Sequence, residues 1–325
     1  MKAIVQDSYG SADVLELRDI DRPTIGDNDV LVRVHAAGVD PGVWHLMTGL
    51  PYLVRLAGYG LRAPKNPVRG RDLAGRVEAV GKSVTRFRPG DAVFGTCEAS
   101  FAEYACAHED RLALKPENLT FEQAAAVPVS ALTALHGLRG PGNLQSGQKV
   151  LIIGAAGGIG SFAVQLAKAL EAEVTGVCSA GKADLVRSLG ADHVIDYATE
   201  DFADGARQYD LILDPVGNRS LADLRRALTP RGTAVLVGGE GGGEWFGLLG
   251  RSLGAMMLTP FVGQNLRGLI YKETREDLEL VRELVLAGKV TPVIDRTYPL
   301  REAPDAIRYM RNGHARGKIV ISVAA

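Results

Sequence analysis

A glycine-rich turn is the feature of the sequence best suited to chemistry. In the segment VLIIGAAGGIGSFAVQLAKALEAEVTGVCS, the pattern predicts a strand, a glycine turn, a helix and a second strand. The last two glycines of the fingerprint G-x-G-x-x-G are Gly157 and Gly160, and its first position holds Ala155. We expect the amides of Gly157, Gly158, Ile159 and Gly160 to bind the diphosphate of a nicotinamide dinucleotide. The alternative is a strand-to-helix turn that binds no ligand.

The end of the second strand predicts which dinucleotide is bound. A site selective for NAD places Asp or Glu there, where the carboxylate accepts hydrogen bonds from the adenosine ribose. Here the strand ends in Val177, Cys178 and Ser179, so no carboxylate repels a 2'-phosphate. Ser179 can donate a hydrogen bond and Lys182 supplies a positive charge, which favours NADP(H). Alternatively, Lys182 is a solvated residue in the first turn of the next helix.

Composition and charge exclude several classes of protein. The 325 residues are 46% hydrophobic and 23% charged, which is typical of a globular chain with room for two domains. A formal net charge of -1 gives no basic field for nucleic acid, and no stretch approaches the roughly 18 apolar residues of a membrane span. We therefore expect a cytoplasmic protein with no nucleic-acid or membrane partner. Cys97, Cys106 and Cys178 lack CxxC spacing, which predicts reduced thiols.

The order of the predicted elements indicates an α/β protein. Residues 1 to about 125 show short strands broken by Gly, Pro and Asp, typical of a small β barrel, with a long loop at 50–68. Thr120, followed by Glu122 and Gln123, predicts a capped helix over 120–134. From Lys149 onward, apolar runs alternate with amphipathic helices, as in βαβ units around a buried parallel sheet. The final strand, 318–323, would return to the first domain.

Several ordered motifs resemble the medium-chain dehydrogenase/reductase superfamily, and its quinone oxidoreductases in particular. They are GRDLAGRVEAVGKSVTRFRPGDAVFG at 70–95, AAAVPVSALTALHGL at 124–138 and GAAGGIG, followed by LGADHVIDY, LILDPVGN and HARGKIVI. The resemblance implies a GroES-like β-barrel catalytic domain at 1–122, a Rossmann domain with a doubly wound parallel sheet at 123–262, and a return to the catalytic domain at 263–325. It also implies a homodimer, for which an edge strand after Thr233 could pair across a two-fold axis.

The resemblance further implies several cofactor contacts. Tyr197 of the HVIDY segment would lie near the adenosine 2'-phosphate, although a strand-end aromatic packed on the sheet is an equal alternative. Thr133, Gly239, Phe261 and Val262 would lie near the nicotinamide.

The positions that carry zinc ligands in related alcohol dehydrogenases differ here. The matching residues are Asp40 and Arg71, and no cysteine occurs between Cys106 and Cys178. An arginine cannot serve as a zinc ligand. Asp40, His45, His35 and Asp72 are ligand types, but their spacing matches no zinc pattern, so we predict no metal.

Without a Lewis acid, reduction of an electron-poor acceptor is the better hypothesis. We predict NADPH-dependent hydride transfer to quinones or other conjugated carbonyls, with Asp40, His45 and Tyr52 as the polar groups facing the nicotinamide. His45 or Tyr52 would donate a proton to the nascent oxygen. Alternatively, His45 is a half-buried loop residue, Tyr52 packs in the loop and Asp40 pairs with Arg71. The other functions that remain open are an enoyl-thioester or alkenal reductase and a non-catalytic NADPH-binding protein.

Overall fold

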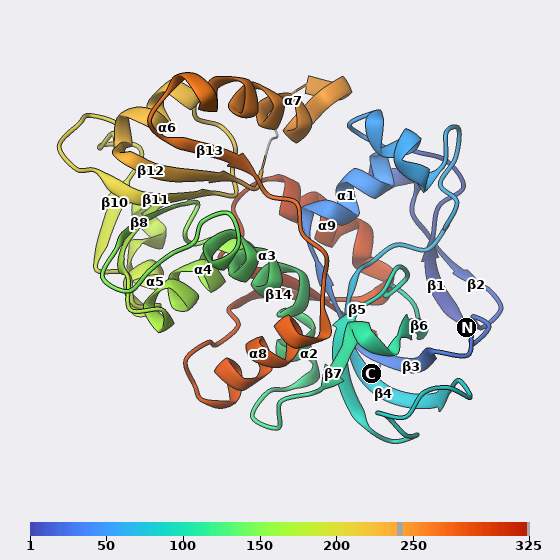
Figure 1. Cartoon of the computed structure of the whole chain (residues 1–325). Helices are drawn as coiled ribbons and strands as arrows, with labels where there is room; N and C mark the ends of the chain where they lie inside the picture. Colours follow the sequence, from blue (N-terminus) through green and yellow to red (C-terminus); the bar gives the residue numbers. More distant parts are fainter. Residues whose placement is uncertain (239–242, 324–325) are drawn as a thin grey trace. The chain divides into compact units, whose positions relative to one another are not determined.

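The chain divides into two compact units (Figure 1). The computed structural model describes residues 1–238 and 243–323. Unit 1 consists of Met1–Leu132, Glu273–Gly288 and Pro292–Ala325, and unit 2 of Thr133–Lys272 and Lys289–Thr291. The units therefore change at 132/133, 272/273, 288/289 and 291/292. The domain limits predicted from the sequence were 122 and 262.

Unit 1 contains a seven-stranded sheet in the order β14-β15-β3-β4-β5-β7, with β6 paired to β3. Its strands are β3 (Asp29–Val39), β4 (Asp72–Val80), β5 (Ala92–Thr96), β6 (Tyr104–His108), β7 (Leu112–Leu114), β14 (Ile294–Pro299) and β15 (Lys318–Ser322). A separate antiparallel pair joins β1 (Lys2–Val5) to β2 (Glu16–Asp19). Val30, Val32 and Val34 alternate along β3 into a buried apolar cluster. Strand β15 pairs with β3, so the last strand returns to the first unit as the sequence predicted.

The helices of unit 1 differ from the prediction at two places. They are α1 (Pro41–Thr48), α2 (Phe121–Ala125), α8 (Arg275–Leu286) and α9 (Ala303–Arg311), and α3 (Pro128–Arg139) spans the border of the units. Thr120 caps α2 through a capping box with Gln123, as predicted. The helix predicted over 120–134 is nevertheless two helices, because Pro128 lacks an amide hydrogen and opens a new helix instead. The predicted loop 50–68 includes a π-helical turn, η2 (Arg55–Tyr59).

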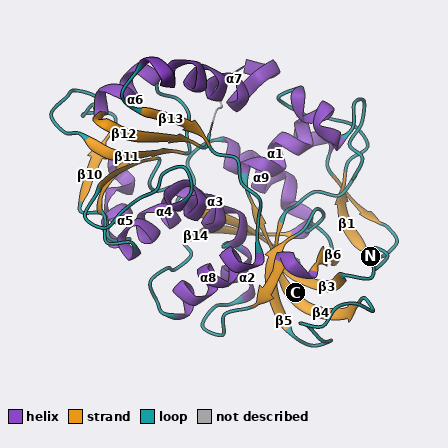
Figure 2. Ribbon diagram, in the orientation of Figure 1, coloured by secondary structure: helices purple, strands orange, loops and turns teal. Residues whose placement is uncertain are grey.

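Unit 2 contains a six-stranded parallel sheet in the order β10-β9-β8-β11-β12-β13. Its strands are β8 (Lys149–Ile153), β9 (Glu173–Cys178), β10 (His193–Asp196), β11 (Tyr209–Asp214), β12 (Leu228–Leu236) and β13 (Asn265–Gly268). Its helices are α4 (Gly158–Ala169), α5 (Ala183–Ser188), α6 (Leu221–Ala227) and α7 (Gly243–Leu258). In Figure 2, α4 and α5 lie on one face of this sheet, and α6 and α7 on the other. This is the doubly wound parallel sheet that the sequence predicted.

Strand β13 lies at the outer edge of the unit 2 sheet. Strand β12, which contains Thr233, pairs with β13 on its outer side. Among the described strands, β13 is therefore the edge on that side, and it follows Thr233 in the chain. None of the helices in the described part of the chain combines the length and apolarity that a membrane crossing requires.

Candidate functional site

The turn between β8 and α4 depends on two glycines that approach each other closely. Gly154 follows β8 directly with a φ of 73°, a left-handed conformation that favours glycine. A Cβ atom on Gly160 would lie 2.1 Å from the carbonyl oxygen of Gly154, so only glycine fits there without a backbone shift. The fingerprint assigned the first turn position to Ala155 and missed Gly154. A glycine directly after the last apolar residue of the strand was the signal for it.

The start of α4 fits a diphosphate. Gly157 is the N-cap of α4 and offers no side-chain hydrogen bond to the first turn. The amides of Gly158, Ile159 and Gly160 belong to that first turn, where a helix has no internal acceptors for them. They are therefore open to an anion, which the helix dipole also favours.

A buried carboxylate shapes the neighbouring loop, which follows β11. Asp214 accepts the amides of Val216, at 3.2 Å, and of Gly217, at 2.9 Å, and its carboxylate lies 2.7 Å from the Arg251 guanidinium. This holds Val216 against the glycine turn, because a Cβ atom on Gly154 would meet Val216 Cγ2 at 2.6 Å. From the sequence, LILDPVGN was identified only as a family motif, and none of these contacts was predicted.

Ser179, Lys182 and Tyr197 gather at the carboxyl ends of β9 and β10. The Tyr197 amide donates to the carbonyl of Cys178 at 3.2 Å, and the Lys182 amide donates to the carbonyl of Ser179 at 2.9 Å. The Tyr197 side chain is 63% exposed, so it does not pack on the sheet as the alternative proposed.

Charges of both signs surround this strand end. Burial raises the pKa of the Cys178 thiol, as does Asp196, whereas Lys182 and Arg187 act in the opposite direction. Two cations and one carboxylate therefore lie within electrostatic range of the end of β9. The carboxylate comes from β10, not from the end of β9, where an NAD-selective site would carry it.

The residues predicted for the nicotinamide side lie in different surroundings. The Thr133 hydroxyl is 2.8 Å from the hydroxyl of Tyr271, and the Tyr271 ring stacks on His136 at 4.3 Å between centroids. Val262 is half-buried, whereas Phe261 is 85% exposed within the structure. Gly239 lies outside the described residues. Tyr271 was not predicted, because no motif marked it.

In unit 1, Asp40 and His45 lie at opposite ends of α1. Asp40 is buried and caps the helix by accepting the Gly42 amide at 2.7 Å, and its other carboxylate oxygen has no hydrogen-bond partner among the described residues. His45 Nδ1 lies 2.8 Å from the carbonyl oxygen of Leu50. Because a carbonyl only accepts, Nδ1 carries a proton, and Nε2 of the neutral ring is an acceptor. His45 can therefore donate a proton from Nε2 only when its ring is doubly protonated.

Tyr52 follows α1 and lies against a cation. The Arg55 guanidinium is 4.8 Å from the centre of the Tyr52 ring and 4.4 Å from that of Tyr9. Tyr9 in turn donates from its hydroxyl to the carbonyl of Gly60 at 2.7 Å. The structure thus brings Tyr52 and His45 to the same end of α1. Tyr9 was not predicted, because it is remote in the chain.

A buried ion pair supports the strands that lead into α1. Lys318 Nζ lies 3.0 Å from the Asp72 carboxylate, and both side chains are fully buried or nearly so. Asp72 also accepts the Val129 amide at 2.7 Å. Gly38 of β3 lies between strands β15 and β4. A Cβ atom on Gly38 would be 2.6 Å from the Asp72 carboxylate. Burial raises the pKa of Asp72 to about 6, against the lowering effect of the Lys318 ammonium.

The residues at the zinc-ligand positions have other partners. Arg71 forms an ion pair with Glu273 at 2.6 Å. The alternative considered from the sequence was an ion pair between Arg71 and Asp40. His35 stacks on Phe121 at 4.2 Å between centroids. Across residues 1–238 and 243–323, no group of three or more His, Cys, Asp or Glu side chains is placed to hold a metal ion. The three cysteines are free thiols.

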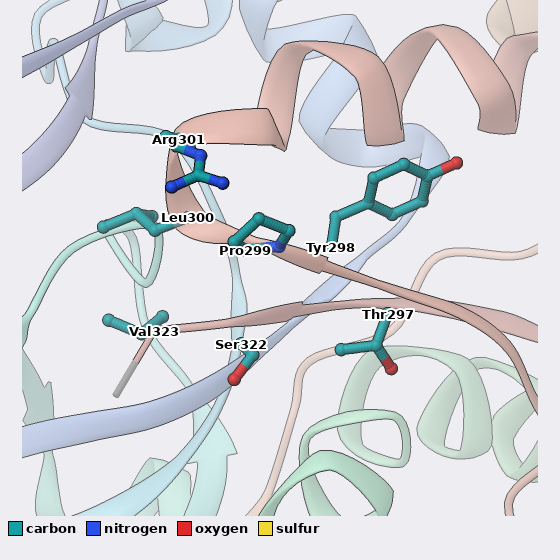
Figure 3. A pocket seen from close by; sticks show the side chains of 7 residues that line it. All are labelled: Thr297, Tyr298, Pro299, Leu300, Arg301, Ser322 and Val323. Carbon is teal, nitrogen blue, oxygen red and sulfur yellow. The ribbon is translucent and has the colours of Figure 1, made fainter. Parts of the chain in front are cut away.

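A separate pocket of about 440 Å³ lies in unit 1 at the carboxyl ends of β14 and β15 (Figure 3). Among the described residues that line it, the charged one is Arg301, whose side chain is 73% exposed and pairs with Glu302 at 3.5 Å. None of the residues singled out from the sequence lines it, and we assign it no part in the candidate site.

Comparison with known proteins identifies the family. A family described as "Alcohol dehydrogenase GroES-like domain" matches residues 26–117, and one described as "Zinc-binding dehydrogenase" matches residues 189–321. The chain is 35% identical to the human mitochondrial NAD(P)H oxidoreductase RTN4IP1, over 99% of this chain and 89% of that protein. It is 34% identical to the 2-methylene-furan-3-one reductase of Solanum lycopersicum, over 99% and 79%.

A solved structure agrees with these relatives. The Escherichia coli quinone oxidoreductase complexed with NADPH matches with a TM-score of 0.85 and 25% identity, over 99% of this chain and 100% of that one. The nicotinamide cofactor expected from the glycine turn is thereby supported. The chain belongs to the medium-chain dehydrogenase/reductase superfamily, among the quinone oxidoreductases and their relatives, and is an oxidoreductase.

Proposed function

We propose that the protein reduces small conjugated carbonyl acceptors, quinones or α,β-unsaturated carbonyls, with NADPH and without zinc. The observation that carries the proposal is the end of β9, where Ser179, Lys182 and Tyr197 gather and the strand itself ends without a carboxylate. A hydroxyl and an ammonium suit a 2'-phosphate, whereas the ribose hydroxyls of NADH would call for an acceptor there.

The residues of the chain would divide the work as follows. Gly158, Ile159 and Gly160 hold the diphosphate through their amides, and bound NADPH supplies the hydride. Tyr52 donates a proton to the acceptor oxygen, because a phenol O–H is a hydrogen-bond donor, whereas His45 with its proton on Nδ1 presents an acceptor at Nε2. His45 then orients Tyr52 or the acceptor.

The absence of a zinc requirement is part of the same proposal. Asp40 is engaged as a helix cap, Arg71 is paired with Glu273, and Asp72 is paired with Lys318. A metal at these positions would have to break contacts that α1 and the sheet use. Activity that survives exhaustive chelation would support this, and activity restored only by zinc would contradict it.

Steady-state assays at 340 nm test the function. We expect NADPH oxidation with 1,2-naphthoquinone and with simple enones, and a loss of about 100-fold in kcat for Tyr52→Phe. Tyr59→Phe, the same change in the same loop at a residue that is 46% exposed, is the control and should leave kcat unchanged. No NADPH oxidation with either class of acceptor would reject the proposal. A higher turnover of conjugated thioesters or alkenals than of quinones would favour the second reading, an enoyl-thioester or alkenal reductase.

We further propose that two copies associate along the edge of β13 that pairs with no other strand in the described part of the chain. Apolar side chains of α7 and of the segment beside β13 are exposed there, namely Leu253, Met256, Met257 and Ile270. An unpaired strand edge beside an apolar surface suits a two-fold contact. Light scattering should give twice the mass of the chain, and Met257→Asp should halve it. A monomeric wild-type protein would contradict the proposal.

A further inference from the structure

The segment from Pro41 to Arg71 has a charge pattern unlike the rest of the chain. It contains five Lys and Arg residues and no Asp or Glu, whereas the whole chain carries 37 basic and 38 acidic residues. The basic residues are Arg55, Arg62, Lys65, Arg69 and Arg71. This segment also carries His45 and Tyr52, the groups proposed to face the acceptor.

Arg55 is held in place by neutral groups. Its Nε donates to the carbonyl of Gly49 at 3.0 Å, and its Nη2 donates to the carbonyl of Thr48 at 3.3 Å, at the carboxyl end of α1. The rings of Tyr9 and Tyr52 both contact the guanidinium. A guanidinium has five N–H donors, and these two bonds use one each from Nε and Nη2. The remaining donors can bind an anion beside Tyr52.

A second cation of the segment, Arg69, has no carboxylate partner among the described residues. Arg69 is buried, donates to the carbonyl of Asn66, and has no hydrogen-bond partner for its Nε in the same part of the chain. Burial lowers the pKa of Arg69 to about 10, so it still carries its charge at neutral pH. Both Arg55 and Arg69 act electrostatically on Tyr9.

The other cations of the segment add to the positive potential of Arg55 and Arg69. Arg62 and Lys65 are exposed, and Arg71 is the one member of the set for which the described residues provide a carboxylate, that of Glu273. Because partial burial weakens the screening by water, the charges of Arg55 and Arg69 attract an anion more strongly than surface charges do.

We propose that this segment selects acceptors that carry a negative charge, and that Arg55 binds a carboxylate, sulfonate or phosphate group attached to the conjugated carbonyl. Arg62 and Lys65 draw such acceptors to the site by longer-range attraction. The inference rests on the proposed function, since it places Tyr52 beside the acceptor.

Two matched acceptors test it. We would measure kcat/KM with NADPH for 1,2-naphthoquinone and for 1,2-naphthoquinone-4-sulfonate. The readout is the kcat/KM of the sulfonate divided by that of the parent quinone. Arg55→Gln should lower this ratio about 10-fold, and Arg62→Gln about 2-fold, because the second charge acts at a distance. Lys82→Gln, a residue of the same unit that pairs with Asp27 at 3.0 Å, should leave the ratio unchanged.

Calorimetric titration of the sulfonate into the protein saturated with NADP+ gives a readout that does not depend on turnover. Arg55→Gln should weaken this binding about 10-fold. If the wild-type protein reduces both quinones but Arg55→Gln changes neither the ratio nor the affinity, the anion site is rejected and the proposed function stands. If no quinone is reduced, the proposed function fails, and the titration alone decides whether Arg55 binds the sulfonate.

Discussion

The candidate residues form two groups, a backbone half in unit 2 and a side-chain half in unit 1, and the two groups are built by different means. In unit 2, the turn from Gly154 to Gly160 relies on backbone geometry, since its close approach depends on missing side chains and its ligand groups are amides. In unit 1, the groups around α1 are side chains, each positioned by a few polar contacts, such as that of His45 with the carbonyl of Leu50. A site made of backbone tolerates few substitutions and serves one ligand. A site made of side chains can change its specificity while the sheet beneath it is preserved.

The first prediction concerns the support of the side-chain half. Asp72→Asn should lower the free energy of unfolding by about 4 kcal/mol, because it leaves the buried Lys318 ammonium without its counter-charge. Urea unfolding measures this. Asp27→Asn, in the exposed pair with Lys82, is the control and should cost below about 1 kcal/mol. Equal costs for the two variants would show that the buried pair does not support unit 1.

The second prediction concerns the backbone half. Gly160→Ala should destabilise the protein by about 3 kcal/mol and abolish NADPH binding, because the new methyl group would meet the carbonyl of Gly154. Gly254→Ala in α7 is the matched control, since its nearest contact would be an ordinary 3.8 Å to Leu221. It should be neutral or stabilising by about 1 kcal/mol. Thermal unfolding and calorimetry report both effects, and unchanged NADPH affinity in Gly160→Ala would break the comparison.

A smaller effect is expected where a side chain takes part in the dinucleotide half. Lys182→Ala should weaken NADPH binding about 10-fold and leave NADH binding unchanged, because only NADPH has the 2'-phosphate. Lys149→Ala is the control for this variant. It removes the same charge at the amino end of β8, which is the opposite end of the strands from Lys182. Equal losses for the two nucleotides would place Lys182 away from the phosphate.

The smallest expected effect is a pH dependence in unit 1. Burial lowers the pKa of His35 below its ordinary value, as do Arg76 and Arg33. The unfolded chain then binds a proton that the folded protein does not, so stability is full above about pH 6.5 and falls as the pH drops below it. The expected decrease in the free energy of unfolding between pH 7.5 and pH 5.5 is below about 1 kcal/mol, and His35→Gln should remove it. Unfolding curves at the two pH values measure it. An unaltered slope would assign the decrease to other groups.

The sequence predicted the backbone half better than the side-chain half, for a physical reason. Glycine spacing and apolar periodicity are local, so they were sufficient to identify the strand, turn and helix around Gly157 and the parallel sheet. The contact between Tyr9 and Arg55 and the pairing of Asp72 with Lys318 join residues far apart in the chain. Local patterns carry no information on such contacts, and Asp40 accordingly was predicted as a site residue with no sign that it caps α1.

The prediction was also incomplete where a local pattern admits two structures. The apolar run after Thr120 fitted one helix, and only the proline at 128 indicated that a second helix begins there. Tyr271 had no neighbouring motif, and its partner Thr133 is remote in sequence, so its place beside His136 became visible only in the fold.

The central position of β15 in its sheet has a consequence for synthesis of the protein. This strand lies between β14 and β3, yet it is translated after every strand of unit 2. On the ribosome, unit 2 can close its sheet while Ala36–Val39 of β3, the part that pairs with β15, is still open on one edge, and an open edge is a site for misassociation with other nascent chains. Lys318 arrives last and supplies the counter-charge for Asp72. Docking of β15 therefore closes the remaining edge of β3 and completes the buried ion pair of Asp72.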